Sequence, residues 1–297
     1  MVIAVITVFH KERFRVDDWK RYYAEYREDV SLHVIVNNGD PEDDSYLQES
    51  FPSSKILFCP SSSLMVAYNQ GLREVLAHPE VDAVAQVGND IRIEAGGLKA
   101  LYDYLFSQDG LAMVAPVLLR KDSDVVDCFG CRVDLRNLDF FHLDAGAHLD
   151  RQAPSDRMVT GLPGGMFLAR RDRYETFGFQ DENLVMYSDE LERSLKVMSI
   201  GWKMGATSRV RSWHQHVNPG GKVQRSPHAA FLMGRNPVLI ARKYLPGRTA
   251  VRVFLRRLFV GLDELRSAVM HAKSWEHHRF GWALVKGAFA GLFQRVR

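Results

Sequence analysis

The chain has 297 residues, of which 46% are hydrophobic and 25% are charged, and its formal net charge is +3. This composition allows a sizeable core and excludes wholesale disorder, while the near balance of charge gives no reason to expect a nucleic-acid partner. Three cysteines in a chain of this length exclude a disulfide framework and favour a reducing compartment.

The first residues, MVIAVITVFHKER, lack the basic segment that precedes the apolar run of a secretory signal peptide. No window of the sequence reaches the roughly 18 to 20 apolar residues that span a bilayer. We therefore expect a cytoplasmic protein, either free or held peripherally on the inner face of the cytoplasmic membrane.

Strand and helix patterns alternate along the first 120 residues. Continuous apolar runs rich in β-branched residues predict buried strands, at 2–9, 32–38, 54–60, 81–88 and 111–119. Helical patterns predict the segments between them, at 16–29, 63–78 and 96–108. This alternation predicts an α/β domain with a mostly parallel sheet, in which ligands bind outside the carboxyl ends of the strands.

The second half of the chain begins with a polar, less regular stretch over 120–158. Residues 161–178 predict a glycine-rich turn, a short strand and a helix, and 186–205 predict a helix with Ser188 as its N-cap. A strand and a histidine-bearing loop follow over 207–221. From about residue 226 the pattern is helical, so we expect a catalytic domain over 1–225 and a helical extension over 226–297.

Polar side chains follow several of these predicted strands. They are Asn37 and Asn38 with Asp43, then Asp90 in the sequence VGND, then Asp189 and Glu190 at a helix start, and His214 in SWHQH. Because strand ends meet at one edge of a parallel sheet, we expect these groups to lie near one another.

Here the chain resembles the inverting glycosyltransferases of family 2, and most closely their rhamnosyltransferase-like branch. The resemblance rests on the order and spacing of several short motifs and covers roughly residues 2–245. The motifs are VITVFHKE, VIVNNGDPEDDS, AYNQGLREV, VGNDI, GGMFLARRD, MYSDELERSLKVMSIGWKM, SWHQH and FLMGRNPVLIARKYLP. The resemblance implies the GT-A fold, a Rossmann-like architecture that binds nucleoside-diphosphate sugars.

The resemblance implies a divalent cation, Mg²⁺ or Mn²⁺, held by Asp90 and His214 against the diphosphate of the donor. Carboxylate is a suitable ligand for either ion, and imidazole favours Mn²⁺. Asp90 is the last residue of a Gly88-Asn89-Asp90 triplet, in which the family has an additional acid at the first position. Asp90 as a turn cap and His214 as a structural histidine are the alternative interpretations, and His216 is a weaker candidate ligand.

The Asp189-Glu190 pair stands where the family has an acidic pair in the opposite order. By position Glu190 is implied to be the general base that takes the proton of the acceptor hydroxyl, with Asp189 as the second candidate. Acids in the first turn of a helix are also favoured by its dipole, so a structural role is the alternative.

The resemblance implies that further residues contact the nucleotide sugar. These residues are Thr7, Phe9, Asn37, Asp43, Asn69, Asn89, Gly164, Gly165 and Arg235. Turn and cap chemistry explains Asn37, Asp43 and Asn69 equally well, and simple turn glycines explain the Gly164-Gly165 pair.

Cys128, Cys131, His142 and His148 form a competing pattern, C-x2-C-x10-H-x5-H, which is close to the spacing of zinc ligands. Its spacing is not standard, and the same residues also fit a strand with two buried thiols. A zinc-stabilised binding module is therefore a separate hypothesis.

The helical extension interleaves Arg with Phe, Leu and Trp, as in RVFLRRLFVGLDELRSAV and RFGWALVKGAFAGLFQRVR. Such helices can lie in the headgroup layer of an anionic membrane, or pack on the catalytic domain or on a second subunit.

The resemblance implies a metal-dependent inverting glycosyltransferase with a dTDP- or UDP-sugar donor, and it alone suggests dTDP-L-rhamnose. The acceptor would be a glycan or lipid-linked glycan of the cell envelope, such as a lipopolysaccharide core or O-antigen. The altered triplet and reversed acid pair leave a second hypothesis, a non-catalytic nucleotide-sugar-binding or scaffold protein.

Overall fold

The computed structural model describes residues 1–150, 155–215, 226–271 and 275–294. The chain forms two compact units, which are described separately below. The first comprises the described parts of Met1–Arg132, Phe141–Val185 and Arg193–Val217, and the second those of Val133–Phe140, Met186–Glu192 and Asn218–Arg297.

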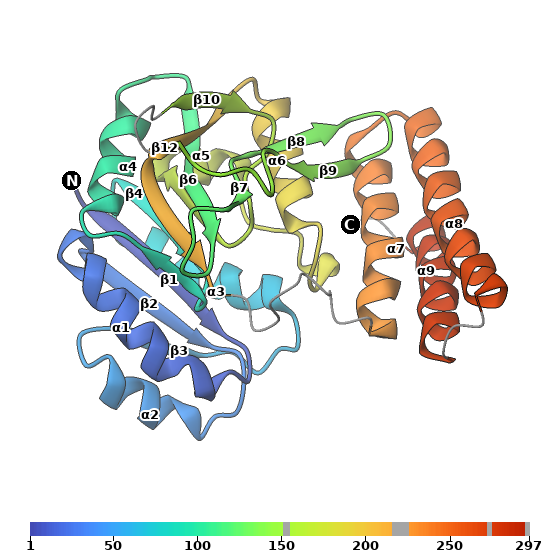
Figure 1. The fold of residues 1–297 in the computed structure, drawn as a ribbon. Coiled ribbons are helices and arrows are strands. Elements are labelled where there is room, and N and C mark those ends of the chain that lie inside the picture. Colours follow the sequence, from blue (N-terminus) through green and yellow to red (C-terminus); the bar gives the residue numbers. More distant parts are fainter. Residues whose placement is uncertain (151–154, 216–225, 272–274, 295–297) are drawn as a thin grey trace. The chain divides into compact units, whose positions relative to one another are not determined.

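A ten-stranded sheet forms the centre of the first unit, in the order β10-β12-β6-β11-β4-β1-β2-β3, with β5 beside β12 and β7 beside β6 (Figure 1). The strands are β1 (Ile3–Phe9), β2 (Leu32–Asn37), β3 (Lys55–Phe58), β4 (Ala83–Val87), β5 (Ile91–Ile93), β6 (Leu111–Arg120), β7 (Val126–Cys128), β10 (Asp156–Val159), β11 (Met166–Arg170) and β12 (Lys203–His214).

The strands on one side of this sheet are parallel: β1 pairs with β2 and β4, and β2 pairs with β3. β12 runs parallel to β6, and the antiparallel strand β11 joins the two halves. The predicted α/β class, with a mostly parallel sheet and C-terminal helices, is confirmed. The carboxyl ends of β1, β2 and β4 therefore lie at one edge, where the predicted polar residues follow them.

Helices cover both faces of the sheet because its central strands are apolar on both sides, and every residue of β1 is buried. The helices are α1 (Val16–Tyr26), α2 (Asp43–Ser50), α3 (Leu64–Leu76), α4 (Gly97–Phe106) and α5 (Arg171–Phe177). Gly71 lets α3 approach the sheet closely, since a Cβ atom there would lie 2.7 Å from Ile6 Cγ2. The Ser63 hydroxyl caps α3 by accepting from the amide of Val66.

Two expectations about secondary structure are wrong. The stretch 120–158, predicted only to be less regular and without any strand, contains β7, β8 (Cys131–Asp134) and β9 (Asp139–His142) and the start of β10. The helix predicted over 186–205 is the shorter α6 (Asp189–Ser199). Val185, Tyr187 and Ser188 have φ angles of 64°, 66° and 64°, which no helix can include, and Gly201 at φ 78° ends the following turn.

The second unit is built mainly from α7 (Pro227–Tyr244), α8 (Gly247–Met270) and α9 (Trp275–Phe293). The Ser226 hydroxyl accepts from the Ala229 amide and caps α7, and Pro227 follows at the first helical position. Glycines let α7 and α9 touch through their backbones: a Cβ atom on Gly287 would lie 2.0 Å from the Phe231 carbonyl oxygen.

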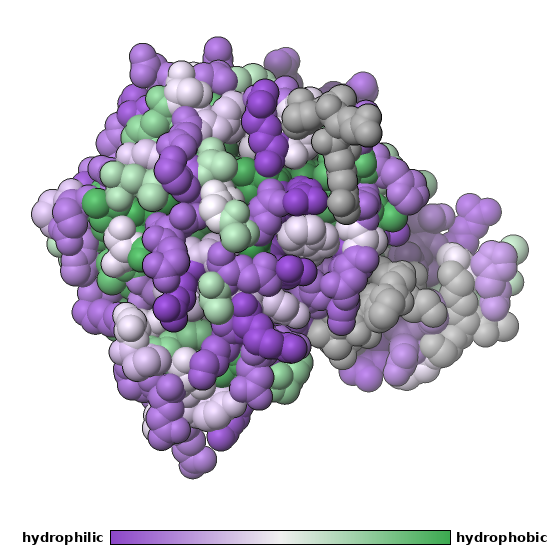
Figure 2. All heavy atoms as spheres, turned by 60° about the vertical axis from the view of Figure 1, so that its left-hand side comes forward, coloured by the Kyte–Doolittle hydropathy of each residue, from purple (hydrophilic) through white to green (hydrophobic). Residues whose placement is uncertain are grey.

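The surface of the first unit on the side of α1 and α4 is predominantly hydrophilic, with small hydrophobic areas between the charged residues (Figure 2). That pattern is ordinary for a surface in water. Within the described ranges, no helix combines the length and the apolar character needed to cross a bilayer.

Candidate metal and nucleotide site

The centre of the candidate site is a carboxylate–imidazole pair at the end of β4 and β12. His214 Nε2 lies 3.3 Å from Asp90 Oδ2. The pairing of β5 with β12 sets this distance, because Ile91 and His214 are directly opposite each other and the Gln215 amide donates to the Asp90 carbonyl at 2.8 Å. The structure thus brings together the two residues predicted to bind the metal.

A third residue, Asp127 of β7, completes this pair. Its Oδ2 lies 3.1 Å from His214 Nδ1, on the other side of the imidazole ring from Asp90. When Nδ1–H donates to a carboxylate, the lone pair of Nε2 is available to a cation, as in the carboxylate–histidine–metal arrangement common in metalloproteins. Sequence reasoning missed Asp127, which lies in the stretch predicted to be irregular.

The electrostatics of the pair favour positive charge at Nε2. Burial lowers the pKa of His214, but the hydrogen bonds and charges of Asp127 and Asp90 outweigh it and raise that pKa to about 9. A divalent cation bound at Nε2 would replace this proton. Two cis ligands of an octahedral cation, each 2.0–2.1 Å from the metal, lie about 3 Å apart, close to the observed 3.3 Å.

The loop after β1 supplies a cation and an acid to the same place. Arg15 Nη1 lies 3.9 Å from Asp90 Oδ2, and Arg15 Nε donates to Glu12 Oε1 at 3.0 Å. The other oxygen of Glu12 accepts from Asn89 Nδ2 at 2.6 Å. Arg15 and Glu12 were also missed by sequence reasoning.

Glycines allow the loop around Asp90 to close. The Gly88 amide donates to the Gly165 carbonyl at 2.8 Å, and Gln86 Nε2 donates to the Gly164 carbonyl at 3.4 Å. A Cβ atom on Gly88 would lie 3.0 Å from Asp90 Oδ1. A side chain at the first position of the triplet would therefore make a close contact with the carboxylate that follows it.

The ends of β1 and β2 place three of the predicted nucleotide contacts together. Phe9, Asn37 and Asp43 line a small hollow of about 10 Å³, roughly the volume of one water molecule. Asn37 Nδ2 donates to Asp44 Oδ1 at 2.7 Å, and Asp43 Oδ1 pairs with Arg13 at 3.3 Å.

Two other predicted contacts lie inside the first unit. Thr7 is fully buried, and its hydroxyl lies 3.5 Å from His33 Nε2. Asn69 is buried in α3, where its Nδ2 donates to the Gln180 carbonyl at 2.9 Å and its Oδ1 accepts from the Gln180 amide at 2.9 Å. The Thr7 side chain thus connects β1 to β2, and the Asn69 side chain connects α3 to the segment around Gln180.

Asp189 and Glu190 begin α6 and belong to the second unit, as does Arg235 of α7. The segment before them is fixed by α7: Asn236 Nδ2 donates at 2.8 Å to the carbonyls of both Met186 and Tyr187. Arg235 Nε in turn donates to Asn236 Oδ1 at 3.0 Å. The backbone strain before Asp189 is thus held by hydrogen bonds from the GRN segment.

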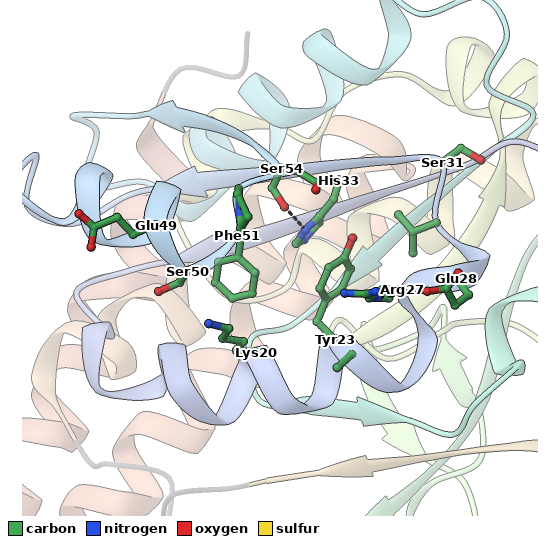
Figure 3. Close-up of a pocket in the computed structure, with 14 residues that line it drawn as sticks. Lys20, Tyr23, Arg27, Glu28, Ser31, His33, Glu49, Ser50, Phe51 and Ser54 are labelled. Atoms are coloured by element: carbon green, nitrogen blue, oxygen red, sulfur yellow. Dashed lines mark hydrogen bonds and ion pairs between the residues drawn. The ribbon is translucent and has the colours of Figure 1, made fainter.

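A separate pocket of about 530 Å³ lies at the opposite, amino ends of β2 and β3 (Figure 3). Tyr23 of α1 stacks on His33 with ring centroids 4.3 Å apart, and Phe51 and Ser54 close the other side. His33 Nδ1 lies 2.7 Å from Ser54 Oγ, and burial lowers the pKa of this imidazole to about 3. His33 is therefore neutral near pH 7.

The four residues of the C-x2-C-x10-H-x5-H pattern are not all brought together. Cys128, Cys131 and His142 each offer a ligand atom, and these atoms lie within 4.8 Å of one another. His148 is exposed and pairs through its backbone with Val125. His216, the weaker candidate for the catalytic cation, lies outside the described residues.

Neither a protein-family model nor a curated protein matches the chain. The solved structures that are similar to it include GalNAc-T7 and mannosyltransferase PcManGT. GalNAc-T7, crystallised with UDP, GalNAc and Mn²⁺, has a TM-score of 0.62 and 16% identity, over 82% of this chain and 48% of its own. Mannosyltransferase PcManGT from Pyrobaculum calidifontis, in complex with GDP-Man and Mn²⁺, has a TM-score of 0.57 and 12% identity, over 99% and 87%.

The likeness shows the fold of this chain to be GT-A, as predicted. The chain spans about half the length of GalNAc-T7 and most of the length of the mannosyltransferase.

Proposed function

We propose that this protein is a metal-dependent glycosyltransferase that uses a nucleoside-diphosphate sugar. The observation that carries the proposal is the Asp90–His214 pair with Asp127 behind it, at the carboxyl edge of a GT-A sheet. The two similar structures were both solved with Mn²⁺, one with UDP and one with GDP-Man, which supports a cation and a nucleotide at this edge.

Asp90 and His214 would hold the cation, Mn²⁺ or Mg²⁺. When bound, it offsets the negative charge that develops on the departing diphosphate. Asp127 keeps the His214 ring in one orientation and one tautomer. Arg15, 3.9 Å from Asp90, is a second positive group that can face the phosphates.

The reaction we propose is a single displacement with inversion at the anomeric carbon. The oxygen of the acceptor hydroxyl forms a bond to that carbon, the bond from carbon to the phosphate oxygen breaks, and the electron pair leaves with the diphosphate. Glu190 takes the proton of the hydroxyl as general base, with Asp189 as the alternative. A family 2 relationship, a rhamnose donor such as dTDP-L-rhamnose and a cell-envelope acceptor are the finer parts of this proposal, and they rest on the sequence resemblance.

The second unit supplies a surface suited to a lipid-linked acceptor. Large apolar residues on α8 and α9 are exposed, at Val251, Leu255, Phe259, Leu262, Val269, Met270, Trp275, Trp282, Phe289 and Phe293. Arg248, Arg252 and Arg256 lie on the same stretch of α8. Exposed aromatic and aliphatic side chains next to basic ones are typical of helices that bind the surface of anionic membranes. We include peripheral membrane binding in the proposal, with self-association as its alternative.

The experiment that tests the function is release of nucleoside diphosphate from UDP-, GDP- and dTDP-sugars, with and without Mn²⁺. We expect one donor class to be turned over only with the metal, and Glu190→Gln to lower the rate by about 10²- to 10⁴-fold. Glu182→Gln, in the first unit, is the matched control and should retain activity. Metal-dependent binding of a nucleotide without turnover of any donor would instead favour the non-catalytic scaffold.

A further inference from the structure

Two thiols and an imidazole converge in the first unit, at a place the proposed reaction does not use. The ligand atoms of Cys128, Cys131 and His142 lie within 4.8 Å of one another. Cys128 follows Asp127 in β7, and neighbouring strand residues point to opposite faces. Cys128, which belongs to the thiol cluster, and Asp127, which contacts His214, therefore lie on opposite faces of the short strand β7.

Local backbone geometry produces this convergence. The turn between the cysteines contains Gly130 at φ 72°, where a Cβ atom would lie 2.6 Å from Val159 Cγ1, so only glycine fits. Leu143 pairs with the turn in both directions, since the Phe129 amide donates to its carbonyl and its own amide donates to the Gly130 carbonyl, each at 3.0 Å. These bonds place His142 beside the two thiols.

The distance between the sulfur atoms suits a shared metal. Cys128 Sγ and Cys131 Sγ are 3.4 Å apart, and both cysteines are fully buried and in no disulfide. A disulfide requires about 2.05 Å. Two thiolates bound 2.3 Å from a tetrahedral zinc ion lie about 3.8 Å apart, so a shift of a few tenths of an ångström completes the geometry.

The chemistry of these ligands selects a metal different from that of the Asp90–His214 pair. Thiolates favour Zn²⁺ over the hard cations Mg²⁺ and Mn²⁺, which favour oxygen ligands. Two thiolates and Zn²⁺ sum to zero charge, so the ion can be held at two buried side chains without leaving a net charge there. Hydrophobic packing alone explains two buried thiols, but it does not explain the imidazole directed at them.

We propose that Cys128, Cys131 and His142 bind a zinc ion that ties the β7–β8 turn to the end of β9. His142 is exposed, so a water molecule would supply the fourth ligand that these three side chains do not. Because β7 also carries Asp127, the zinc ion would stiffen the strand that orients His214.

The test is elemental analysis of the full-length protein purified without chelators, followed by Co²⁺ binding to the metal-free protein. We expect one zinc per chain and, with cobalt, a thiolate-to-metal charge-transfer band in the near ultraviolet. His142→Ala changes an exposed residue, so we expect the fold to be retained. The variant should lose more than the roughly 10- to 100-fold in zinc affinity that loss of a group hydrogen-bonded to a ligand costs. Cys131→Ser should abolish the charge-transfer band.

The matched controls are His148→Ala and Cys59→Ser, which remove the fourth residue of the pattern and the remaining cysteine. Both should keep full zinc content, as should Asp90→Asn. Substoichiometric zinc with no cobalt–thiolate band would overturn the proposal. So would a Cys128–Cys131 disulfide in the freshly purified protein, or equal zinc in His142→Ala and His148→Ala.

Discussion

At the scale of single residues, the site depends on what surrounds Asp90. The first two residues of the triplet shape the surroundings of the Asp90 carboxylate. A Cβ atom on Gly88 would lie close to that carboxylate, and the Asn89 side chain donates a hydrogen bond to Glu12. Asp127 orients His214 from behind. These supporting contacts decide whether a carboxylate at a strand end is a turn residue or a cation ligand.

The Asp127→Asn variant tests this support. An amide retains the size of the side chain but removes its charge and its preference for the Nδ1–H tautomer, so we expect Mn²⁺ affinity to fall about 10- to 100-fold. The measurement is calorimetric titration of Mn²⁺ in the presence of the nucleotide. Asp122→Asn, an exposed change in the turn before β7, should bind as the wild type does. Equal affinity in the two variants would remove Asp127 from the site.

His33 predicts a specific dependence of stability on pH. Its pKa of about 3 in the folded protein is below the value near 6.5 of an unfolded chain, so below pH 6.5 the unfolded state takes up a proton that the folded state refuses. Stability must therefore fall as the pH is lowered from 6.5 toward 3. We expect His33 to account for about 2 kcal/mol of the loss between pH 7.5 and pH 5.

Urea unfolding of wild type and His33→Gln at the two pH values measures this contribution. The glutamine amide can keep the hydrogen bond to Ser54 but does not titrate, so the variant should lose less stability at pH 5. Exposed His148→Gln should follow the wild-type curve. An identical pH loss in wild type and His33→Gln would show that His33 is not kept neutral by the fold.

Only some residues of the candidate site could be predicted from the sequence. Asp90 follows β4, whose apolar run is easy to recognise, and His214 could be identified by the resemblance of its SWHQH segment. Asp127, Arg15 and Glu12 could not, because Asp127 lies on a three-residue strand, and the other two lie in a loop whose path depends on tertiary contacts. The donor and base assignments stay predictions.

At the scale of elements, strands buried on both faces were predicted well. β1, β2, β4 and β6 all begin and end within a few residues of their predicted limits. The short antiparallel strands over 120–158 were not predicted, since pairs of strands with three or four residues carry too little periodicity. The helix predicted over 186–205, with Ser188 as its N-cap, does begin after Ser188, but it ends at Ser199 because Gly201 has a φ angle of 78° and β12 starts at Lys203.

The contact between α7 and α9 predicts a strong position dependence for glycine. In Gly287→Ala the new Cβ would lie 2.0 Å from the Phe231 carbonyl, so the helices must separate, at a cost of about 1–3 kcal/mol or more. Gly247→Ala, whose Cβ meets nothing within 4 Å, should leave stability within about 0.5 kcal/mol. Thermal unfolding of the two variants checks this. Equal melting temperatures would mean that the two helices do not pack through their glycines.

At the scale of the whole molecule, the exposed apolar and basic residues of α8 and α9 predict a preference for anionic lipid. Protein should sediment with vesicles containing phosphatidylglycerol and not with phosphatidylcholine vesicles, and added salt should weaken the association. Phe259→Ser combined with Trp282→Ser should reduce it, whereas Met158→Ser, an exposed change in the first unit, should not. A concentration-dependent dimer that ignores vesicles would assign these helices to self-association.

The central claim is that Asp90 and His214 hold a divalent cation against a nucleoside diphosphate. The most direct measurement is a thermal-shift panel of UDP, GDP, dTDP and ADP, each with and without Mn²⁺, on wild type and Asp90→Asn. A ligand at a hundredfold excess over its Kd raises stability by about 2.7 kcal/mol. We predict a shift of that order for one nucleotide, only with Mn²⁺ and only in wild type. A shift that persists in Asp90→Asn, or no shift with any nucleotide, would contradict the account.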